Sequence, residues 1–234
     1  MGADDSPGLE REFKFLLEPI QYETLWSRLR TRAKLRLQEN LFFDRDGLLR
    51  RIHWALRLRL EREPDLAHVV DAFSKPPDLN ELNWRAARAL VTLKGPVLSV
   101  EQGVQRPEIE EEISVVTAEA AKGPGRLLCE HIPQRILHTL RGLLSDGQHL
   151  PDAFIQFISF SNLRLSWEAN RSNNAIEVAL DKSQRSDGRM RYELEVEWNG
   201  TDERAVREIL AHLETELYQP TTRGKLTWAV GDDF

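Results

Sequence analysis

Five separate segments of this sequence alternate charged and apolar residues with the two-residue period of a β-strand, and this alternation restricts the possible folds more than any other feature. Successive side chains of a strand point to opposite faces, so residues at i, i+2 and i+4 lie on the same face. One face of each segment is therefore charged and the other is mainly apolar. The charged faces carry Glu10, Glu12 and Lys14; Arg57, Arg59, Glu61 and Glu63; Arg106, Glu108, Glu110 and Glu112; Glu177 and Asp181; and Glu193, Glu195 and Glu197.

A sheet with its apolar face on a core and its charged face in water accounts for any one of these segments. It accounts less well for five of them, because like charges at i and i+2 repel one another unless a counter-charge lies among them. A closed antiparallel barrel with a polar interior removes the difficulty, since helices can then cover its apolar outside. We therefore expect an α+β protein of eight or nine strands arranged as such a barrel.

The remaining elements follow from local patterns. Residues 1–8 are expected to form a disordered tail and residues 9–234 a single domain, in which 64–88 form an insertion. Pro19 suits the first turn of a helix, so a helix is predicted at 19–35. Strands are predicted at 9–17, 40–44, 54–63, 89–95, 106–116, 155–167, 175–180, 191–198 and, with a weaker alternation, 225–230, and further helical stretches at 117–146 and 201–218.

Composition excludes several classes of protein. The single cysteine, Cys129, cannot form an internal disulfide, and no apolar run approaches the roughly 20 residues of a membrane-spanning helix. The N-terminal residues lack the basic and apolar regions of a signal peptide, so we expect a cytoplasmic location and no membrane partner. A net charge of −6 is not typical of a nucleic-acid-binding protein, whereas arginines at alternate strand positions indicate a focused anion site.

The charged faces combine carboxylates with guanidinium and ammonium groups at high density. Carboxylates are ligands that suit Mg²⁺ or Mn²⁺, while arginine and lysine neutralise phosphate groups. A barrel interior of this kind therefore suits a polyanion that is bound together with a divalent metal ion.

The segment Glu10-Arg11-Glu12-Phe13-Lys14 has the form Glu-x-Glu-x-Lys, and it resembles the N-terminal signature of the CYTH superfamily, the triphosphate tunnel metalloenzymes. Further motifs of that superfamily follow in order over nearly the whole chain. They are Phe42-Phe43-Asp44; Leu49-Arg50-Arg51 with Ala55-Leu56-Arg57-Leu58-Arg59; Thr92-Leu93-Lys94-Gly95; Arg106-Pro107-Glu108-Ile109-Glu110; Arg164 before Trp167; Glu177 to Asp181; Glu195-Val196-Glu197; and Arg223-Gly224-Lys225. The chain departs from the pattern in two places, since the usual Thr-Pro after Asp44 is missing and the stretch from Arg59 to Thr92 is long.

This resemblance implies a closed eight-stranded antiparallel barrel that forms a tunnel, with Mg²⁺ or Mn²⁺ as the cofactor. The implied metal ligands are Glu10, Glu12, Glu195 and Glu197, completed by Glu108, Glu110 and Asp181. The implied phosphate-binding residues are Lys14, Arg57, Arg59, Lys94, Arg106, Arg164 and Lys225. The residues expected to be catalytic are Glu10, Glu12 and Lys14, with Glu10 orienting or deprotonating the attacking water.

Several activities are compatible with the resemblance. The first is metal-dependent hydrolysis of inorganic triphosphate to pyrophosphate and phosphate. The alternatives are a class IV-type adenylate cyclase that converts ATP to cyclic AMP and pyrophosphate, a thiamine or nucleoside triphosphatase, and a non-catalytic polyphosphate or nucleotide sensor. A triphosphate or nucleotide is the expected partner in each case, nucleic acid is not, and the oligomeric state is left open.

Overall fold

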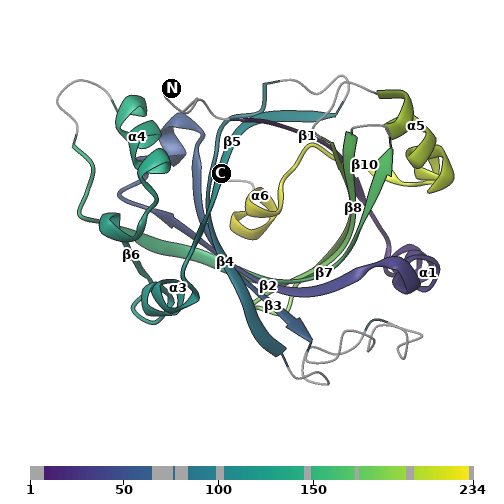
Figure 1. The fold of residues 1–234 in the computed structure, drawn as a ribbon, viewed down its shortest axis with the longest axis horizontal. Coiled ribbons are helices and arrows are strands. Elements are labelled where there is room, and N and C mark those ends of the chain that lie inside the picture. Colours follow the sequence, from purple (N-terminus) through teal and green to yellow (C-terminus); the bar gives the residue numbers. More distant parts are fainter. Residues whose placement is uncertain are drawn as a thin grey trace.

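The computed structural model describes residues 8–64, 76, 84–98, 103–144, 149–171, 174–198 and 203–231. Its centre is a closed β-barrel, which Figure 1 shows end-on. The barrel strands are β1 (Gly8–Leu16), β2 (Lys34–Asp44), β3 (Ala55–Pro64), β4 (Trp84–Lys94), β5 (Val104–Ile113), β7 (Ala153–Arg171), β8 (Asn174–Arg185) and β9 (Met190–Trp198).

Antiparallel pairing runs all the way round this barrel. The spatial order is β1-β5-β4-β3-β2-β7-β8-β9, and β9 pairs with β1 to close the ring. Two short strands lie beside it, β6 (Arg126–Leu128) along β7 and β10 (Gln219–Pro220) along β1. The expected α+β fold with a closed eight-stranded antiparallel barrel is confirmed.

Helices cover the outside of the barrel on two sides (Figure 1). On one side lie α1 (Pro19–Leu29) and α5 (Glu203–His212), and on the other lie α3 (Val115–Lys122) and α4 (Gln134–Leu143). The described residues also include four single-turn 3₁₀ helices: η1 (Arg30–Arg32), η2 (Arg50–Ile52), η4 (Cys129–His131) and η5 (Thr215–Leu217). In the described ranges, no helix is both long enough and apolar enough to span a membrane.

Two hydrophobic cores lie between these helices and the barrel wall. Trp26 of α1 and Val206 of α5 pack with the outward apolar residues of β9, such as Val196. On the other side, Ile136 of α4 packs in the same core as Leu93 of β4. The apolar face of the strands thus points outward and the charged face points inward, as the alternation predicts.

The weak strand predicted at 225–230 is wrong. This segment is a short helix, α6 (Lys225–Val230), which lies within the ring of strands (Figure 1). β10 takes the part of the β1 edge that β5 leaves unpaired, and the segment that follows folds on itself inside the barrel. Ala229 is fully buried and packs with Phe42 and Phe160, two residues that also line the interior.

The helix predicted at 19–35 is too long. α1 ends at Leu29 and β2 begins at Lys34, so residues 34–39 belong to a strand. These residues also fit a period of two, with Leu35 in the outer core and Gln38 facing the interior. Pairing with β7 decides between the two periods, since it satisfies the backbone of the whole segment.

Other boundaries differ by shorter stretches. Both ends of the insertion predicted at 64–88 belong to barrel strands, because β3 runs to Pro64 and β4 begins at Trp84. Apart from Pro76, the residues between them lie outside the described part of the chain, as do residues 1–7 of the predicted tail. Gly8 already pairs with Glu108 in the barrel. The helical stretch predicted at 117–146 divides into α3 and α4, with β6 between them.

Ile136→Ala should lower the free energy of unfolding by about 2–5 kcal/mol, because it removes buried methyl groups and leaves a cavity. Ile136 is fully buried between α4 and the barrel, whereas His138 on the same helix is exposed. His138→Ala is the matched control and should change the free energy of unfolding by less than about 0.5 kcal/mol. Denaturant titration measures both values, and equal effects would contradict this packing.

Candidate active site

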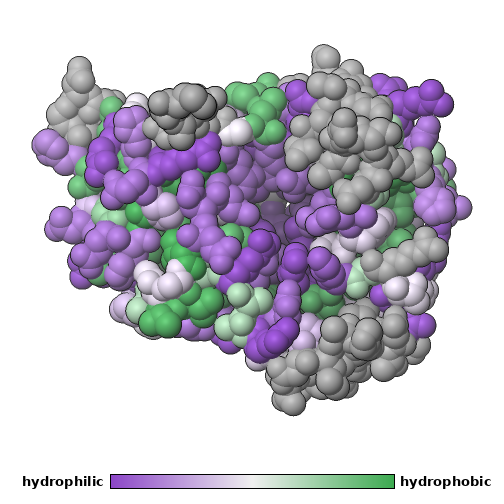
Figure 2. Space-filling model, in the orientation of Figure 1, coloured by the Kyte–Doolittle hydropathy of each residue, from purple (hydrophilic) through white to green (hydrophobic). Residues whose placement is uncertain are grey.

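The interior of the barrel is hollow, with a cavity of about 1060 Å³ that is lined by residues of all eight barrel strands and of α6. Figure 2 shows hydrophilic side chains gathered around the hollow at the centre of the visible face. Every site residue expected from the sequence lines this cavity, with the single exception of Asp181. The alternation therefore brings side chains from distant parts of the chain into one enclosed space.

The register of the strands brings three carboxylates into a row. Glu12 on β1 lies directly opposite Glu197 on β9, and Glu197 lies directly opposite Glu177 on β8. Side chains at opposite positions of antiparallel strands are close neighbours, and like charges there destabilise the sheet. This row is therefore stable only where cations or protons lie among the carboxylates.

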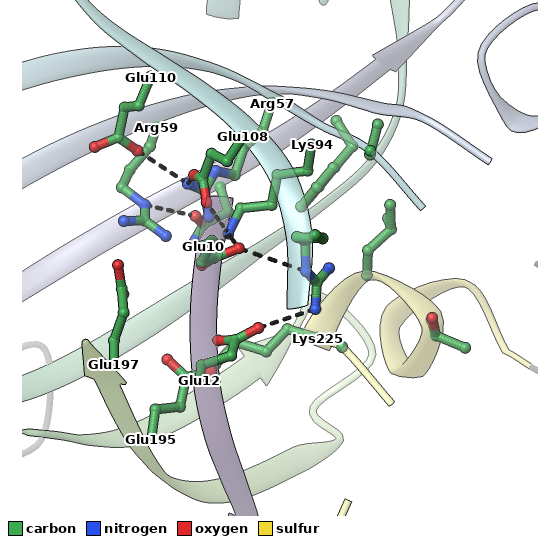
Figure 3. Close-up of a pocket in the computed structure, with 18 of the residues that line it drawn as sticks. Glu10, Glu12, Arg57, Arg59, Lys94, Glu108, Glu110, Glu195, Glu197 and Lys225 are labelled. Atoms are coloured by element: carbon green, nitrogen blue, oxygen red, sulfur yellow. Dashed lines mark hydrogen bonds and ion pairs between the residues drawn. The ribbon is translucent and has the colours of Figure 1, made fainter. Parts of the chain in front are cut away.

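Glu10, Glu108 and Lys94 form a compact cluster in the cavity (Figure 3). The Nζ of Lys94 donates to Oε1 of Glu10 at 2.8 Å and lies 3.0 Å from Oε2 of Glu108. Burial opposes ionisation of Glu10, but the charge of Lys94 and a hydrogen bond from Glu108 outweigh it and hold the pKa of Glu10 well below its ordinary value. Burial raises the pKa of Glu108 to about 7, since Lys94 offsets only part of the effect and the charge of Glu10 adds to it. The two carboxyl groups thus share one ammonium group and one titrating proton.

Glu12 and Glu197 are neighbours in the row but have different surroundings (Figure 3). Glu12 is buried, and its Oε1 lies 2.8 Å from Lys14 Nζ and 2.9 Å from Arg106 Nη2. Glu197 opens into the cavity and makes no hydrogen bond or ion pair with the described residues. Its enclosure in the tunnel limits its hydration, and this effect together with the charge of Glu10 raises the pKa of Glu197 to about 8.

A second cluster of charges lies where α6 meets the barrel wall. Asp181 is fully buried and accepts hydrogen bonds from Nε and Nη2 of Arg164 at 2.9 and 2.6 Å. The Nζ of Lys225 lies 2.8 Å from Asp181, 2.6 Å from Glu195 and 3.1 Å from Glu193. Burial opposes ionisation of Asp181, but Arg164 and Lys225 hold its pKa below the ordinary value. Lys225, carried into the tunnel by α6, is thus the counter-ion of three carboxylates.

Arg57 and Arg59 lie at the centre of a basic wall on β3. Nη2 of Arg57 donates to Oγ1 of Thr92 at 3.0 Å and to Oε2 of Glu110 at 3.2 Å. Nε of Arg59 donates to the amide oxygen of Asn40 at 3.1 Å. Burial, together with the positive charge of Arg57, lowers the pKa of Arg59 to about 10. Positive charge is therefore in excess around Arg59, and an anion in the cavity would balance it.

A group of residues at the end of the tunnel where β2 and β4 begin has no role in the motifs that the sequence displays. Glu61 is buried there and accepts hydrogen bonds from Arg88 Nε at 2.6 Å and Gln38 Nε2 at 2.7 Å, while Arg36 Nε lies 3.8 Å away. The period-two pattern that would identify them is present, since Arg36 and Gln38 alternate on β2. Arg36 and Gln38 fall between the helix predicted at 19–35 and the strand predicted at 40–44, and Arg88 falls in the predicted insertion, so this signal was missed.

The tunnel offers oxygen ligands rather than a preformed metal site. Within the ranges that the structure describes, no group of three or more His, Cys, Asp or Glu side chains is placed to hold a metal ion. The donor chemistry nevertheless fits Mg²⁺ or Mn²⁺, because several carboxylates line the cavity and these cations prefer oxygen ligands. Metal binding would require Lys94 to exchange the carboxylates of Glu10 and Glu108 for other anions. Asp181 fits least well, since it is fully buried beneath its basic partners.

Comparison with solved structures identifies similar barrels. The chain is similar to a protein from Hippeastrum described as a candidate adenylyl cyclase with a dominant triphosphatase activity, with a TM-score of 0.63, 22% identity, and 94% of this chain and 93% of that chain covered. It is also similar to a candidate adenylate cyclase from Bacillus halodurans, with a TM-score of 0.60, 24% identity, and coverage of 95% and 98%. At these identities the likeness establishes the fold. A search of curated protein sequences gave no match.

Comparison with protein families extends the match to the sequence itself. The model of the CYTH domain matches residues 8–224, a range that begins with β1 and includes all eight barrel strands. The Glu-x-Glu-x-Lys motif and the closed barrel lie within this range, and Lys225 of α6 follows directly after it. The chain therefore belongs to the CYTH family.

Proposed function

We propose that this protein hydrolyses triphosphate-containing substrates and that inorganic triphosphate, cut to pyrophosphate and phosphate, is the preferred one. The observation that carries the proposal is the uneven distribution of charge in one cavity: basic side chains predominate on β2, β3 and β4, and carboxylates predominate on β1, β5, β8 and β9. Phosphoryl transfer depends mainly on positioning and on neutralising the charge of the phosphates. Cations on one wall and metal-binding carboxylates on the other suit both tasks.

The similar structures support hydrolysis as the reaction class. The protein from Hippeastrum is described by its dominant triphosphatase activity, and it shares this fold over nearly its whole length. The present chain has the full set of inward-facing basic and acidic residues that the CYTH motifs imply, apart from the buried Asp181. We therefore place hydrolysis ahead of cyclisation.

Arginine and lysine side chains would hold the substrate. Arg57 and Arg59 can bind phosphate oxygens through pairs of parallel N–H bonds, which fix the orientation of the chain. Lys94 and Arg106 are now paired with carboxylates and would transfer their hydrogen bonds to the phosphates on binding. The remaining phosphate-binding residues proposed here are Lys14, Arg164 and Lys225.

Carboxylates would hold the metal and the water. The proposed ligands are Glu10, Glu12, Glu108, Glu110, Glu195 and Glu197. A divalent cation bound by such ligands supplies charge neutralisation and lowers the pKa of water. Glu10 stays ionised at neutral pH because Lys94 and the hydrogen bond from Glu108 outweigh its burial. It can therefore accept a hydrogen bond from the attacking water and orient it, and Lys14, beside Glu12, can stabilise the charge of the reacting phosphate.

An adenylate cyclase is the second candidate, favoured by the size of the cavity. Its volume of about 1060 Å³ lies at the upper end of the range for pockets that hold drug-sized ligands, so it has room for a nucleoside.

One assay with Mg²⁺ and then Mn²⁺, on inorganic triphosphate and ATP in parallel, separates the candidates. Phosphate release mainly from triphosphate would support the proposal, cyclic AMP would support the cyclase, and binding without any product would support a sensor.

Glu10→Gln and Glu12→Gln should each lower kcat by a factor of about 10²–10³ while leaving the fold intact, because each removes a negative charge from the proposed metal and water site. Glu216→Gln is the control, since Glu216 is exposed on η5 outside the barrel. Steady-state kinetics and the melting temperature are measured together. Normal turnover in both tunnel variants would refute this assignment.

Arg57→Ala should raise KM for triphosphate by about tenfold or more, because a guanidinium–phosphate pair is lost from the centre of the basic wall. The loss should appear in KM more than in kcat, since the proposed role is to hold the substrate. Initial rates over a range of triphosphate concentrations test this. An unchanged KM would remove Arg57 from the binding site.

Divalent cations should bind the substrate-free protein more tightly as the pH rises from about 6 to about 9, because carboxyl groups must lose their protons to become ligands. The pKa values of about 7 for Glu108 and about 8 for Glu197 place this change near neutral pH. Calorimetric titration in buffers of different ionisation enthalpy measures both the affinity and the protons released. An affinity independent of pH over this range would exclude both residues as ligands.

A further inference from the structure

We propose that the tunnel contains an additional phosphate subsite, formed by Arg36 and Arg88 at the end where β2 and β4 begin, and that this subsite lets the protein take linear inorganic polyphosphates of four or more phosphates. The inference rests on the proposed function, because it extends the path of the same substrate. It assigns a binding role to two arginines that the CYTH motifs leave without one.

Basic side chains line the cavity over a long distance. Arg36 and Arg88 line the same cavity as Arg57 and Arg59. Arg88 lies six residues before Lys94 on β4, which at roughly 3.3 Å per residue corresponds to about 20 Å along the strand. Inward-facing cations therefore extend well beyond the reach of three linked phosphates. A longer chain could contact the whole row.

Positive charge exceeds negative charge around Glu61 at this end of the tunnel. Glu61 is only 1% exposed, and three guanidinium groups surround it. Arg88 donates a hydrogen bond to it, while Arg36 and Arg59 lie 3.8 Å from its oxygens, beyond hydrogen-bond distance. One carboxylate thus faces three cations.

Other carboxylates reduce this excess without removing it. Glu63 lies 3.8 Å from Arg36, but its side chain is 39% exposed to water at the rim. Glu110 contributes to the field at Arg88, yet its hydrogen bonds go to Arg57 and Thr92. Glu112 of β5 also acts on Arg88, but it is exposed and does not line the cavity.

Arg36 and Arg88 both have N–H groups that donate no hydrogen bond to the described residues. Among the described residues, the one hydrogen bond that these two guanidinium groups donate runs from Nε of Arg88 to Glu61, so the Nη groups of both arginines donate no hydrogen bond there. Their side chains are 19% and 39% exposed, so a ligand can reach them. A planar guanidinium with free donors is suited to a phosphate group.

Buried hydrogen bonds hold Glu61, the partner of Arg88, in position. Gln38 donates to Glu61 at 2.7 Å and accepts a hydrogen bond from Asn162 at 3.0 Å. Asn162 also donates to Asp181 at 2.9 Å, and Asp181 holds Arg164. A continuous buried network thus fixes Glu61, and through it Arg88, relative to the central phosphate-binding residues.

The chemistry of this end favours phosphate over a nucleoside. Arginine is the predominant charged residue there, and the phenyl rings among the described cavity-lining residues, Phe42 and Phe160, pack instead with α6. A base would therefore find no aromatic ring to stack on beside Arg36 and Arg88 in the described lining. A fourth phosphate would find two guanidinium groups.

The test compares chain lengths in the variants Arg36→Gln, Arg88→Gln and the double variant. Initial rates are measured on inorganic triphosphate, tetraphosphate and ATP with Mg²⁺ or Mn²⁺. The ratio of kcat/KM for tetraphosphate to that for triphosphate should fall at least about tenfold in the double variant, because only the longer chain reaches both arginines. Arg204→Gln is the matched control, since it makes the same change of charge at an exposed position of α5 and should leave the ratio as in the wild type.

Two outcomes would overturn the proposal: an unchanged ratio, or an equal loss with both polyphosphates, which would mean that these arginines act on the triphosphate site or on the fold. A loss confined to ATP would likewise overturn it in favour of a nucleoside pocket. If the wild type hydrolyses none of these substrates, the proposed function fails, but the subsite is still decided by calorimetric titration with tetraphosphate and triphosphate. It stands only if the double variant loses a preference of the wild type for the longer chain.

Discussion

Ion pairing between carboxylates and basic side chains inside a closed barrel is the interaction on which the rest of this structure depends. A buried charge that loses its partner costs about 3–5 kcal/mol, so the interior can hold many acidic residues only if it holds basic ones beside them. Asp181 and Glu193 are fully buried, and both lie against Lys225. Closure of the barrel creates this requirement. In an open sheet the charged face would be solvated, and its carboxylates would not need basic partners.

These ion pairs are of two kinds, and the difference bears on function. In pairs such as Arg164 with Asp181 the carboxylate does not line the cavity, so it stays beside its partner and holds the arginine in position. In pairs such as Lys94 with Glu10, both partners line the cavity. If a polyphosphate and a divalent cation enter together, Lys94 can bind phosphate and Glu10 can bind the cation. The number of favourable charge contacts is then conserved, so the exchange need not cost much energy.

The barrel and its inward-facing residues could be predicted because strand alternation is a local signal, and Glu10, Glu12 and Lys14 carry it within five residues. What could not be predicted depends on contacts between distant segments. Residues 34–39 fit both a helix and a strand, and pairing with β7 decides between them. The helical state of α6 depends on its packing with Phe42 and Phe160 in the interior, and the surroundings of Glu61 depend on the register of β2, β3 and β4.

The mixture of charges also favours the proposed metal-dependent hydrolysis over simple binding of an anion. Carboxylates in a binding site repel an anionic ligand, so a receptor for polyphosphate gains nothing from lining its site with them. Glu197 makes this point most clearly, because it faces the cavity without any cationic partner among the described residues, opposite Glu12 and Glu177 in neighbouring strands. A position of this kind raises the energy of the ligand-free protein. Under the proposed function the ligand brings cations with it, because it enters as a metal–polyphosphate complex.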